Sequence, residues 1–197
     1  MRSISSLLAS LALLSVAVAA EDWGDPGADR PTVIERTMRP YAGPSNAGVD
    51  VSTLRGKVMC GYQGWFTAEG DGAGRGWHHW TAGRAFAPGS CKIDLWPDVS
   101  ELDPDERFPT PFKHADGRTA EVFSSFNRKT VLRHFRWMND YGIDGVFVQR
   151  FVGEVSHPRG LRHFNVVLNH CREGANLYGR AYAVMYDLSG MGAGQMQ

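Results

Sequence analysis

The chain has 197 residues, and its 21 Lys and Arg side chains balance its 21 Asp and Glu side chains. A protein that binds nucleic acid through the phosphates carries a basic stripe, so this balance argues against a nucleic-acid partner. Aromatic residues make up 11% of the chain, a heavy load that includes 6 Trp. Such side chains either pack in a core or stack on the apolar faces of sugar rings.

Residues 1–20 have the pattern of a secretory signal peptide. Arg2 precedes an apolar run over 7–18, and the small residues Ala19 and Ala20 stand before Glu21. The run is too short to span a bilayer comfortably, which makes a membrane anchor the weaker interpretation. We expect cleavage after Ala20, a secreted or periplasmic mature chain, and no membrane contact afterwards.

The next part of the chain is irregular. Residues 21–52 are rich in Gly, Pro and Asp, which predicts an extended lead-in with a short helical turn near 32–39. Residues 53–197 are predicted to form one domain, which opens with a strand at 57–66. The stretch from 67 to about 118 lacks periodicity, and an irregular stretch of that length is normally a functional loop or evidence against the assignment.

Strands and helices then alternate. A strand over 120–126 is followed by a helix with Asn127 as its N-cap and Gly142 at its end, and then by a strand over 144–151. A second amphipathic helix covers 160–179, and a last strand covers 180–190. Apolar strands that alternate with amphipathic helices predict parallel βαβ units.

The polar residues of these strands stand at their carboxyl ends, as Gln149 and Arg150 do on one strand and Asp187 and Ser189 on the next. In a (β/α)₈ TIM barrel this end carries the chemistry. A doubly wound sheet has the same polarity, but no G-x-G-x-x-G follows a strand and opens a helix, which disfavours a dinucleotide fold. A whole barrel needs about 250 residues. We therefore expect an α/β chain that holds the first four strands of such a barrel, with a smaller fold as the alternative.

Several segments together resemble a known family. "GYQGWF", "GDGAGRGWHHW", "DLWPDVSEL", "VFSSFNRKTVLRHFRWMNDYGIDGVFVQRF" and "YAVMYDLSG" occur in the order found in the glycoside hydrolase family 71/99-like proteins. These are relatives of the family 99 endo-α-mannosidases and the family 71 α-1,3-glucanases. The resemblance runs from about residue 56 to 190. It implies a (β/α)₈ barrel that hydrolyses α-linked oligo- or polysaccharides without a cofactor.

One departure from family 99 concerns the catalytic carboxylate. Family 99 places a Glu at the end of the strand where this chain has Tyr186-Asp187, which is closer to the Asp of family 71. The resemblance therefore implies Asp187 as a catalytic carboxylate, and it places the partner carboxylate of family 71 on later strands. The family 99 mechanism cannot simply be transferred to this chain.

Glycoside hydrolysis needs two carboxyl groups across the bond that breaks. Asp187 and Glu154, each at or just beyond a strand end, are the catalytic candidates. A loop-bracing role for Asp187 and an exposed loop position for Glu154 are the alternatives. Gln149 and Arg150 alternate along their strand, so only one of them faces the interior. Either can hydrogen-bond a sugar hydroxyl or serve as a structural polar cap.

Aromatic and histidine side chains are the other candidates for substrate binding. They are Tyr62, Trp65, Trp77, His79, Trp80 and Tyr186. Rings beside a glycine-rich loop suit a concave sugar site, and the alternative is a packed plug of aromatic residues.

Other chemistries find little support. The chain has no His-Glu-x-x-His, so zinc is not expected, and no Gly-x-Ser-x-Gly elbow surrounds Ser124 and Ser125. The spacing of the acidic residues over 94–105 matches no Ca²⁺ loop, which predicts a solvated loop and no metal. A carbohydrate-binding relative without catalysis and an exported barrel enzyme of another chemistry remain the alternative functions.

Overall fold

The computed structural model describes residues 28–37, 39–83, 85–192 and 194. The predicted signal peptide at 1–20 lies outside these residues. Helix α1 (Arg30–Thr37) confirms the short helix expected in the lead-in, and an extended segment connects it to strand β1 (Met59–Tyr62). No helix in the described part of the chain is both long and apolar enough to cross a membrane.

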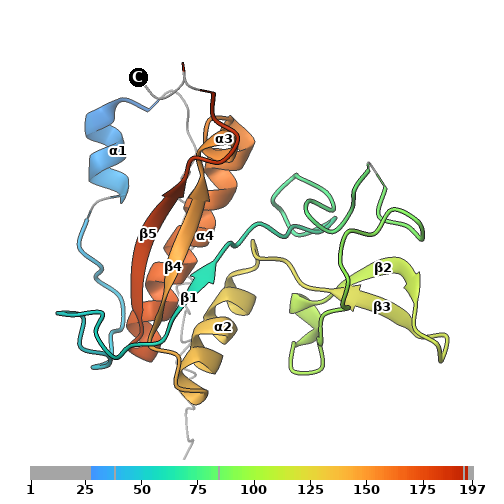
Figure 1. The fold of residues 1–197 in the computed structure, drawn as a ribbon, viewed down its shortest axis with the longest axis horizontal. Helices are drawn as coiled ribbons and strands as arrows, with labels where there is room; N and C mark the ends of the chain where they lie inside the picture. The colour runs from blue at the N-terminus through green and yellow to red at the C-terminus, as the bar shows by residue number, and fades with distance from the viewer. Residues whose placement is uncertain (1–27, 38, 84, 193, 195–197) are drawn as a thin grey trace, which may run out of the picture.

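A three-stranded parallel sheet forms the larger part of the fold (Figure 1). Its order is β1, then β4 (Gly145–Phe151), then β5 (Ala181–Asp187). Helix α2 (Arg128–Asp140) precedes β4, and α4 (Pro158–Tyr178) connects β4 to β5. The short helix α3 (Val152–Val155) follows β4 without a gap.

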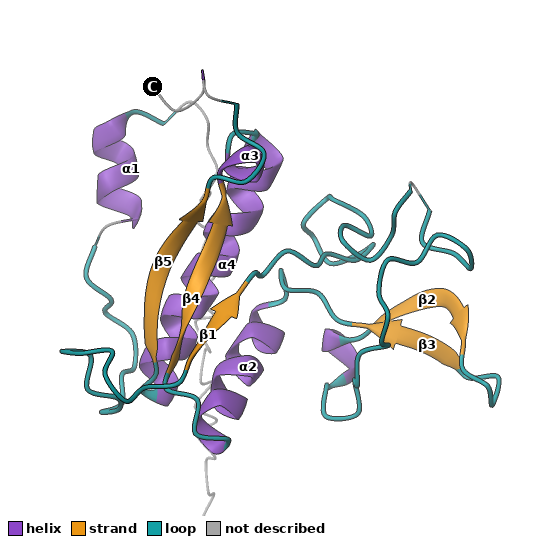
Figure 2. Ribbon diagram, in the orientation of Figure 1, coloured by secondary structure: helices purple, strands orange, loops and turns teal. Residues whose placement is uncertain are grey.

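Both long helices cover the same face of this sheet, and α4 runs behind β4 and β5 in Figure 2. Val146 and Val148 of β4 point to the helices and pack with Phe135 of α2 and with Val167 and Cys171 of α4. Because side chains alternate along a strand, the residues at the odd positions of β4 lie on the other face. That other face carries the candidate site.

An antiparallel hairpin is inserted between β1 and α2. It consists of β2 (Phe108–Lys113) and β3 (Thr119–Val122), and the short 3₁₀ helix η1 (Pro104–Glu106) precedes it. A second core of aromatic side chains lies beneath it, in which Trp77, Trp80 and Phe86 pack against Val122. Figure 1 shows the hairpin beside the parallel sheet and not hydrogen-bonded into it.

The barrel prediction is wrong for the described residues. They form a parallel sheet of three strands and a separate antiparallel pair, and no closed barrel. The error began at 120–126, which was expected to be a parallel strand. β3 instead pairs with β2. Pro109 and Pro111 of β2 lack a backbone N–H, which is why the sequence of β2 predicts a loop and not a strand. The chain then turns at Ser124, whose hydroxyl accepts the Phe126 N–H at 3.0 Å.

The helix predictions are confirmed. The Asn127 side chain caps α2 by accepting the Thr130 N–H at 3.2 Å, and Gly142 just beyond the helix has the left-handed φ of 73°. The strand predicted at 144–151 and the one at 180–190 are β4 and β5. All three cysteines of the chain, Cys60, Cys91 and Cys171, are free.

Candidate functional site

The candidate site lies where the parallel strands end. The loop that follows β1 and the helix α3 that follows β4 both start at the carboxyl edge of the sheet, because the two strands run in the same direction. Six side chains from these two segments and from the last residue of β4 come together there, and we call them the strand-end rim. They are Trp65, Arg75, His78, His79, Phe151 and Glu154.

A charged cluster forms one half of the strand-end rim. Arg75 Nη2 donates to a carboxylate oxygen of Glu154, and it also lies 2.8 Å from Nε2 of His78. The same His78 nitrogen is 3.5 Å from the other Glu154 oxygen. The Arg75 side chain is only 10% exposed, whereas that of Glu154 is 31% exposed. Arg75 is therefore largely enclosed, whereas Glu154 and His78, whose side chains are equally exposed, each keep a solvent-facing side.

Stacked rings form the other half. His79 stacks on Trp65 with ring centroids 3.9 Å apart, and Trp65 stacks on Phe151 at 5.0 Å, each with planes 16° apart. The edge of His78 meets His79 at 4.4 Å, which connects the rings to the charged cluster. His79 is the one described residue other than glycine with a left-handed backbone, at φ 64°. This conformation costs energy for a residue with a Cβ, so the stack is held by a strained turn.

The charge states of the strand-end rim follow from burial and from Arg75. Burial lowers the pKa of His78, and it lowers the pKa of His79 to about 4. Burial acts to raise the pKa of Glu154, but the hydrogen bond and charge of Arg75 outweigh it and hold that pKa below its ordinary value. At neutral pH the rim thus holds a carboxylate, a guanidinium and two neutral imidazoles.

Asp187 ends the neighbouring strand β5 and is the second carboxylate of this edge. It is the register partner of Phe151, so it lies on the same sheet face as Phe151 and Gln149. Gln149 Nε2 donates to the Asp187 carboxylate, and the Ser189 N–H donates to its other oxygen at 2.7 Å. The hydrogen bonds from Ser189 and then from Gln149 lower the pKa of Asp187.

The other predicted site residues lie elsewhere. Tyr62 points into the helix-covered core, with its hydroxyl 2.9 Å from His134 Nδ1. Trp77 and Trp80 are buried in the second core beneath the hairpin.

Arg150 and Tyr186 lie on the helix side of the sheet, on the face opposite Gln149 and Asp187. Arg150 is buried there and donates to the Phe164 carbonyl at 3.0 Å, and its guanidinium stands 5.7 Å from the ring centroid of Tyr186. The structure therefore brings together Trp65, His79 and Glu154, with Gln149 and Asp187 on the adjoining strand ends. A sugar contact by any predicted residue stays a prediction.

Sequence reasoning missed Arg75, His78 and Phe151. One signal could have found Arg75, because it is the only cationic residue between Lys57 and Arg84 in a segment otherwise rich in glycine and aromatic residues. His78 belongs to no catalytic or metal-binding motif in the sequence. The left-handed turn at His79 lets both imidazoles reach the rim.

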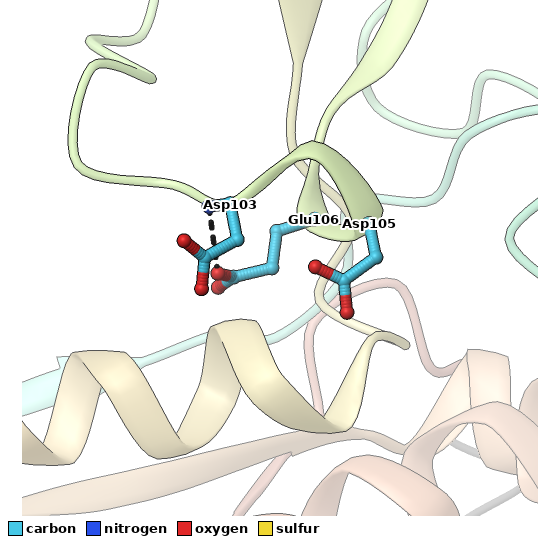
Figure 3. Close-up of side chains that lie close together, drawn as sticks. All are labelled: Asp103, Asp105 and Glu106. Atoms are coloured by element: carbon cyan, nitrogen blue, oxygen red, sulfur yellow. Dashed lines mark hydrogen bonds between the residues drawn. The ribbon is translucent and has the colours of Figure 1, made fainter.

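An acidic group near η1 is a possible metal site by distance alone. Oxygens of Asp103, Asp105 and Glu106 lie within 4.8 Å of one another, and Figure 3 shows the three side chains pointing from η1 towards α2. Two cations of α2 already occupy that position. Lys129 Nζ is 2.9 Å from Asp105 and 2.6 Å from Asp103, while Arg133 pairs with Asp103 at 3.0 Å and bonds the buried Glu106. The group is an ion-pair network that fastens η1 to α2.

Comparisons with models of protein families, with curated proteins and with solved structures found no match for this chain. The function of the strand-end rim is therefore inferred from its own geometry and from the resemblance carried by the sequence motifs.

Proposed function

We propose that this chain is an exported glycoside hydrolase-like protein that acts on α-linked glycans, with the strand-end rim and Asp187 as its sugar site. One observation carries the proposal. Two carboxylates, Asp187 at the end of β5 and Glu154 just after β4, adjoin the stacked rings of Trp65, His79 and Phe151 at one edge of the sheet.

The chemistry of glycoside cleavage suits this arrangement. Ring faces stack on the apolar faces of a sugar, while carboxylates and amides hydrogen-bond its hydroxyls. An ionised carboxylate can attack the anomeric carbon, activate a water molecule, or stabilise the positive charge that develops on the sugar ring. The lowered pKa of Glu154 and of Asp187 fits each residue to one of these roles. The resemblance to the family 71/99-like proteins supports the α-linkage, and the pattern of residues 1–20 supports export.

A second candidate function is sugar binding without cleavage. Hydrolysis also requires a proton donor, and a carboxyl group that serves as one has a raised pKa. Among the described residues of the strand-end rim and β5, the carboxyl groups are those of Glu154 and Asp187, and the pKa of each is lowered. This observation favours a carbohydrate-binding protein that keeps the rings and uses its carboxylates for hydrogen bonds.

Two measurements on the purified chain test both candidates. The first is release of reducing ends from α-1,3-glucan and α-mannan, and the second is retardation of the protein in gels that contain either polysaccharide. Glu154→Gln and Asp187→Asn keep the size of each side chain and remove its charge. We expect each to lower the release of reducing ends by about 100-fold or more. Asp116→Asn, in the exposed hairpin turn, serves as the control and leaves the rate unchanged.

Each outcome supports or contradicts one of the two candidate functions. Retardation without release of reducing ends favours the binding candidate. Release that survives both carboxylate variants overturns the catalytic assignment. Neither retardation nor release with these polysaccharides overturns the proposal that the chain acts on α-linked glucans or mannans.

A further inference from the structure

One hollow on the surface is lined by none of the residues of the strand-end rim. It measures about 290 Å³ and lies between the loop over 98–101 and the last turns of α2. Its lining consists of Asp98, Ser100, Glu101, Trp137 and Tyr141. Tyr141 follows α2 and precedes β4, so this hollow lies towards the amino ends of the parallel strands, whereas the rim lies at their carboxyl ends.

Packing does not account for Tyr141. The residue is 75% exposed, and no hydrogen bond or ring stacking joins its side chain to another described residue. Trp137, one turn earlier, is held in place because its Nε1 donates to Glu101 Oε2 at 2.9 Å. The ring of His134 covers one side of this indole, with centroids 5.5 Å apart. Two rings on the same helix face thus border the hollow, one fixed and one free.

The charge of the lining is negative. Asp98 and Glu101 are carboxylates, and the lining contains no cationic side chain. The Ser100 N–H donates to Asp98 Oδ1 at 2.8 Å, which fixes the orientation of that carboxylate. Outside the lining, the Arg136 guanidinium lies 3.6 Å from the Glu101 carboxylate, but it is shared with Asp140 of its own helix at 3.9 Å. An excess of negative charge therefore stands beside exposed ring surface.

We propose that this hollow binds a small organic cation, an ammonium group carried on an apolar stem. The ring faces of Tyr141 and Trp137 attract such a cation through their quadrupoles, and the Asp98 and Glu101 carboxylates add Coulombic attraction. A neutral sugar would also stack on the rings but would gain nothing from the net charge. The volume is at the small end of ligand sites, which suits a head group and not a long chain. This assignment does not depend on the proposed action on glycans.

Choline is the probe, and calorimetric titration of the full chain is the measurement. We expect saturable binding that weakens as the salt concentration rises, because the attraction is partly electrostatic and the site is exposed. Tyr141→Ala and Asp98→Asn are each expected to weaken binding by about fivefold or more. Tyr141→Phe keeps the ring and is expected to retain most of the affinity. Both residues are exposed, so the variants are expected to fold, and thermal melts check this.

Two further probes and one control variant make the test specific. The probe 3,3-dimethylbutan-1-ol has the shape of choline without its charge, and it is expected to bind at least about fivefold more weakly. Asp116→Asn removes a carboxylate from the distant hairpin turn and is expected to leave choline binding unchanged. Equal binding of the neutral probe, binding of glucose in place of choline, no binding of choline, or unaltered affinity in both Tyr141→Ala and Asp98→Asn would each overturn the proposal.

Discussion

Arg75 is the residue on which the electrostatics of the strand-end rim depend. Its side chain is nine-tenths enclosed, and it contacts both Glu154 and His78. A largely buried guanidinium next to a half-buried carboxylate keeps that carboxylate ionised, and its N–H groups keep the His78 Nε2 lone pair occupied. The loop that follows β1 and helix α3, which follows β4, are thereby held against each other by a charged contact.

We predict that Arg75→Ala lowers the free energy of unfolding at pH 7 by about 1–3 kcal/mol, because it leaves the Glu154 carboxylate without its partner. The folded-state pKa of Glu154 is below its ordinary 4.5, so the unfolded chain binds more protons than the folded chain as the pH falls through this range. The stabilisation from Arg75 is fully present above the unfolded-state pKa of Glu154. It is lost as the pH falls through the lower, folded-state pKa. The difference between wild type and variant is therefore expected to shrink at about pH 3.5.

Urea denaturation at both pH values measures this difference. Arg118→Ala is the matched control, because Arg118 pairs with Asp116 on the surface, where such pairs contribute little. A difference between wild type and Arg75→Ala that grows on acidification would contradict the role given to Arg75.

His79 tests whether the stack is held by a strained turn. Both His79→Ala and His79→Gly remove the ring that stacks on Trp65, but only alanine keeps a Cβ at a φ of 64°. We predict that the glycine variant is the more stable of the two by about 1 kcal/mol, since glycine adopts this conformation without steric cost. Chemical denaturation of the two variants under the same conditions measures this difference in the free energy of unfolding. Equal stabilities would show that the turn is not strained.

At the scale of the elements, η1 and α2 are joined by a network whose members differ in burial. Glu106 is enclosed and bonds Arg133, whose side chain is also largely enclosed, whereas Lys129 and Asp105 lie in solvent. The contribution of a salt bridge depends strongly on such exposure, because removing one partner of an enclosed pair leaves an uncompensated buried charge.

We therefore predict unequal effects from two neighbouring cations of α2. Arg133→Ala is expected to lower the free energy of unfolding by about 3 kcal/mol, and Lys129→Ala by less than about 1 kcal/mol. Urea denaturation in low and high salt measures both, and only the small effect of Lys129→Ala is expected to vanish in high salt. Similar losses in the two variants would mean that Glu106 finds another partner.

At the scale of the whole molecule, the parallel sheet has an open edge. β5 pairs with β4 on one side only, and among the described residues no strand lies on its other side. Val184 and Tyr186 are exposed on its helix-side face, and the strand has no Lys or Pro of the kind that usually protects an edge.

We predict that this edge makes the chain self-associate as its concentration rises, and that Val184→Lys reduces the association without lowering the melting temperature by more than a few degrees. Sedimentation velocity over a range of concentrations measures the association. A wild-type chain that stays monomeric throughout that range would contradict the prediction.

Some elements of the fold could be predicted from the sequence and others could not, and the reason is physical. α2 and α4 could be located because amphipathic periodicity and caps such as Asn127 are local signals. The pairing of β3 with β2 is local, but Pro109 and Pro111 hide the strand character of β2 in the sequence, so the barrel assignment failed there. Glu154 and Asp187 could be chosen because polar residues collect at the ends of parallel strands. The contact of Arg75 with Glu154 could not be predicted, because it depends on the path of a loop and the two residues are 79 positions apart.

The insertion of the hairpin between β1 and α2 has a consequence for the order of folding. β1 pairs with β4 across a long stretch of chain, and the Val58 N–H reaches the Asp144 carboxylate over 86 residues, whereas Gln149 reaches Asp187 over 38. Closing a loop costs about 0.6 kcal/mol more for each doubling of its length. The unit β4–α4–β5 is therefore expected to assemble first, with β1 added last and released first. In native-state hydrogen exchange, the amides of β1 should open at lower free energy than those at the centre of β4.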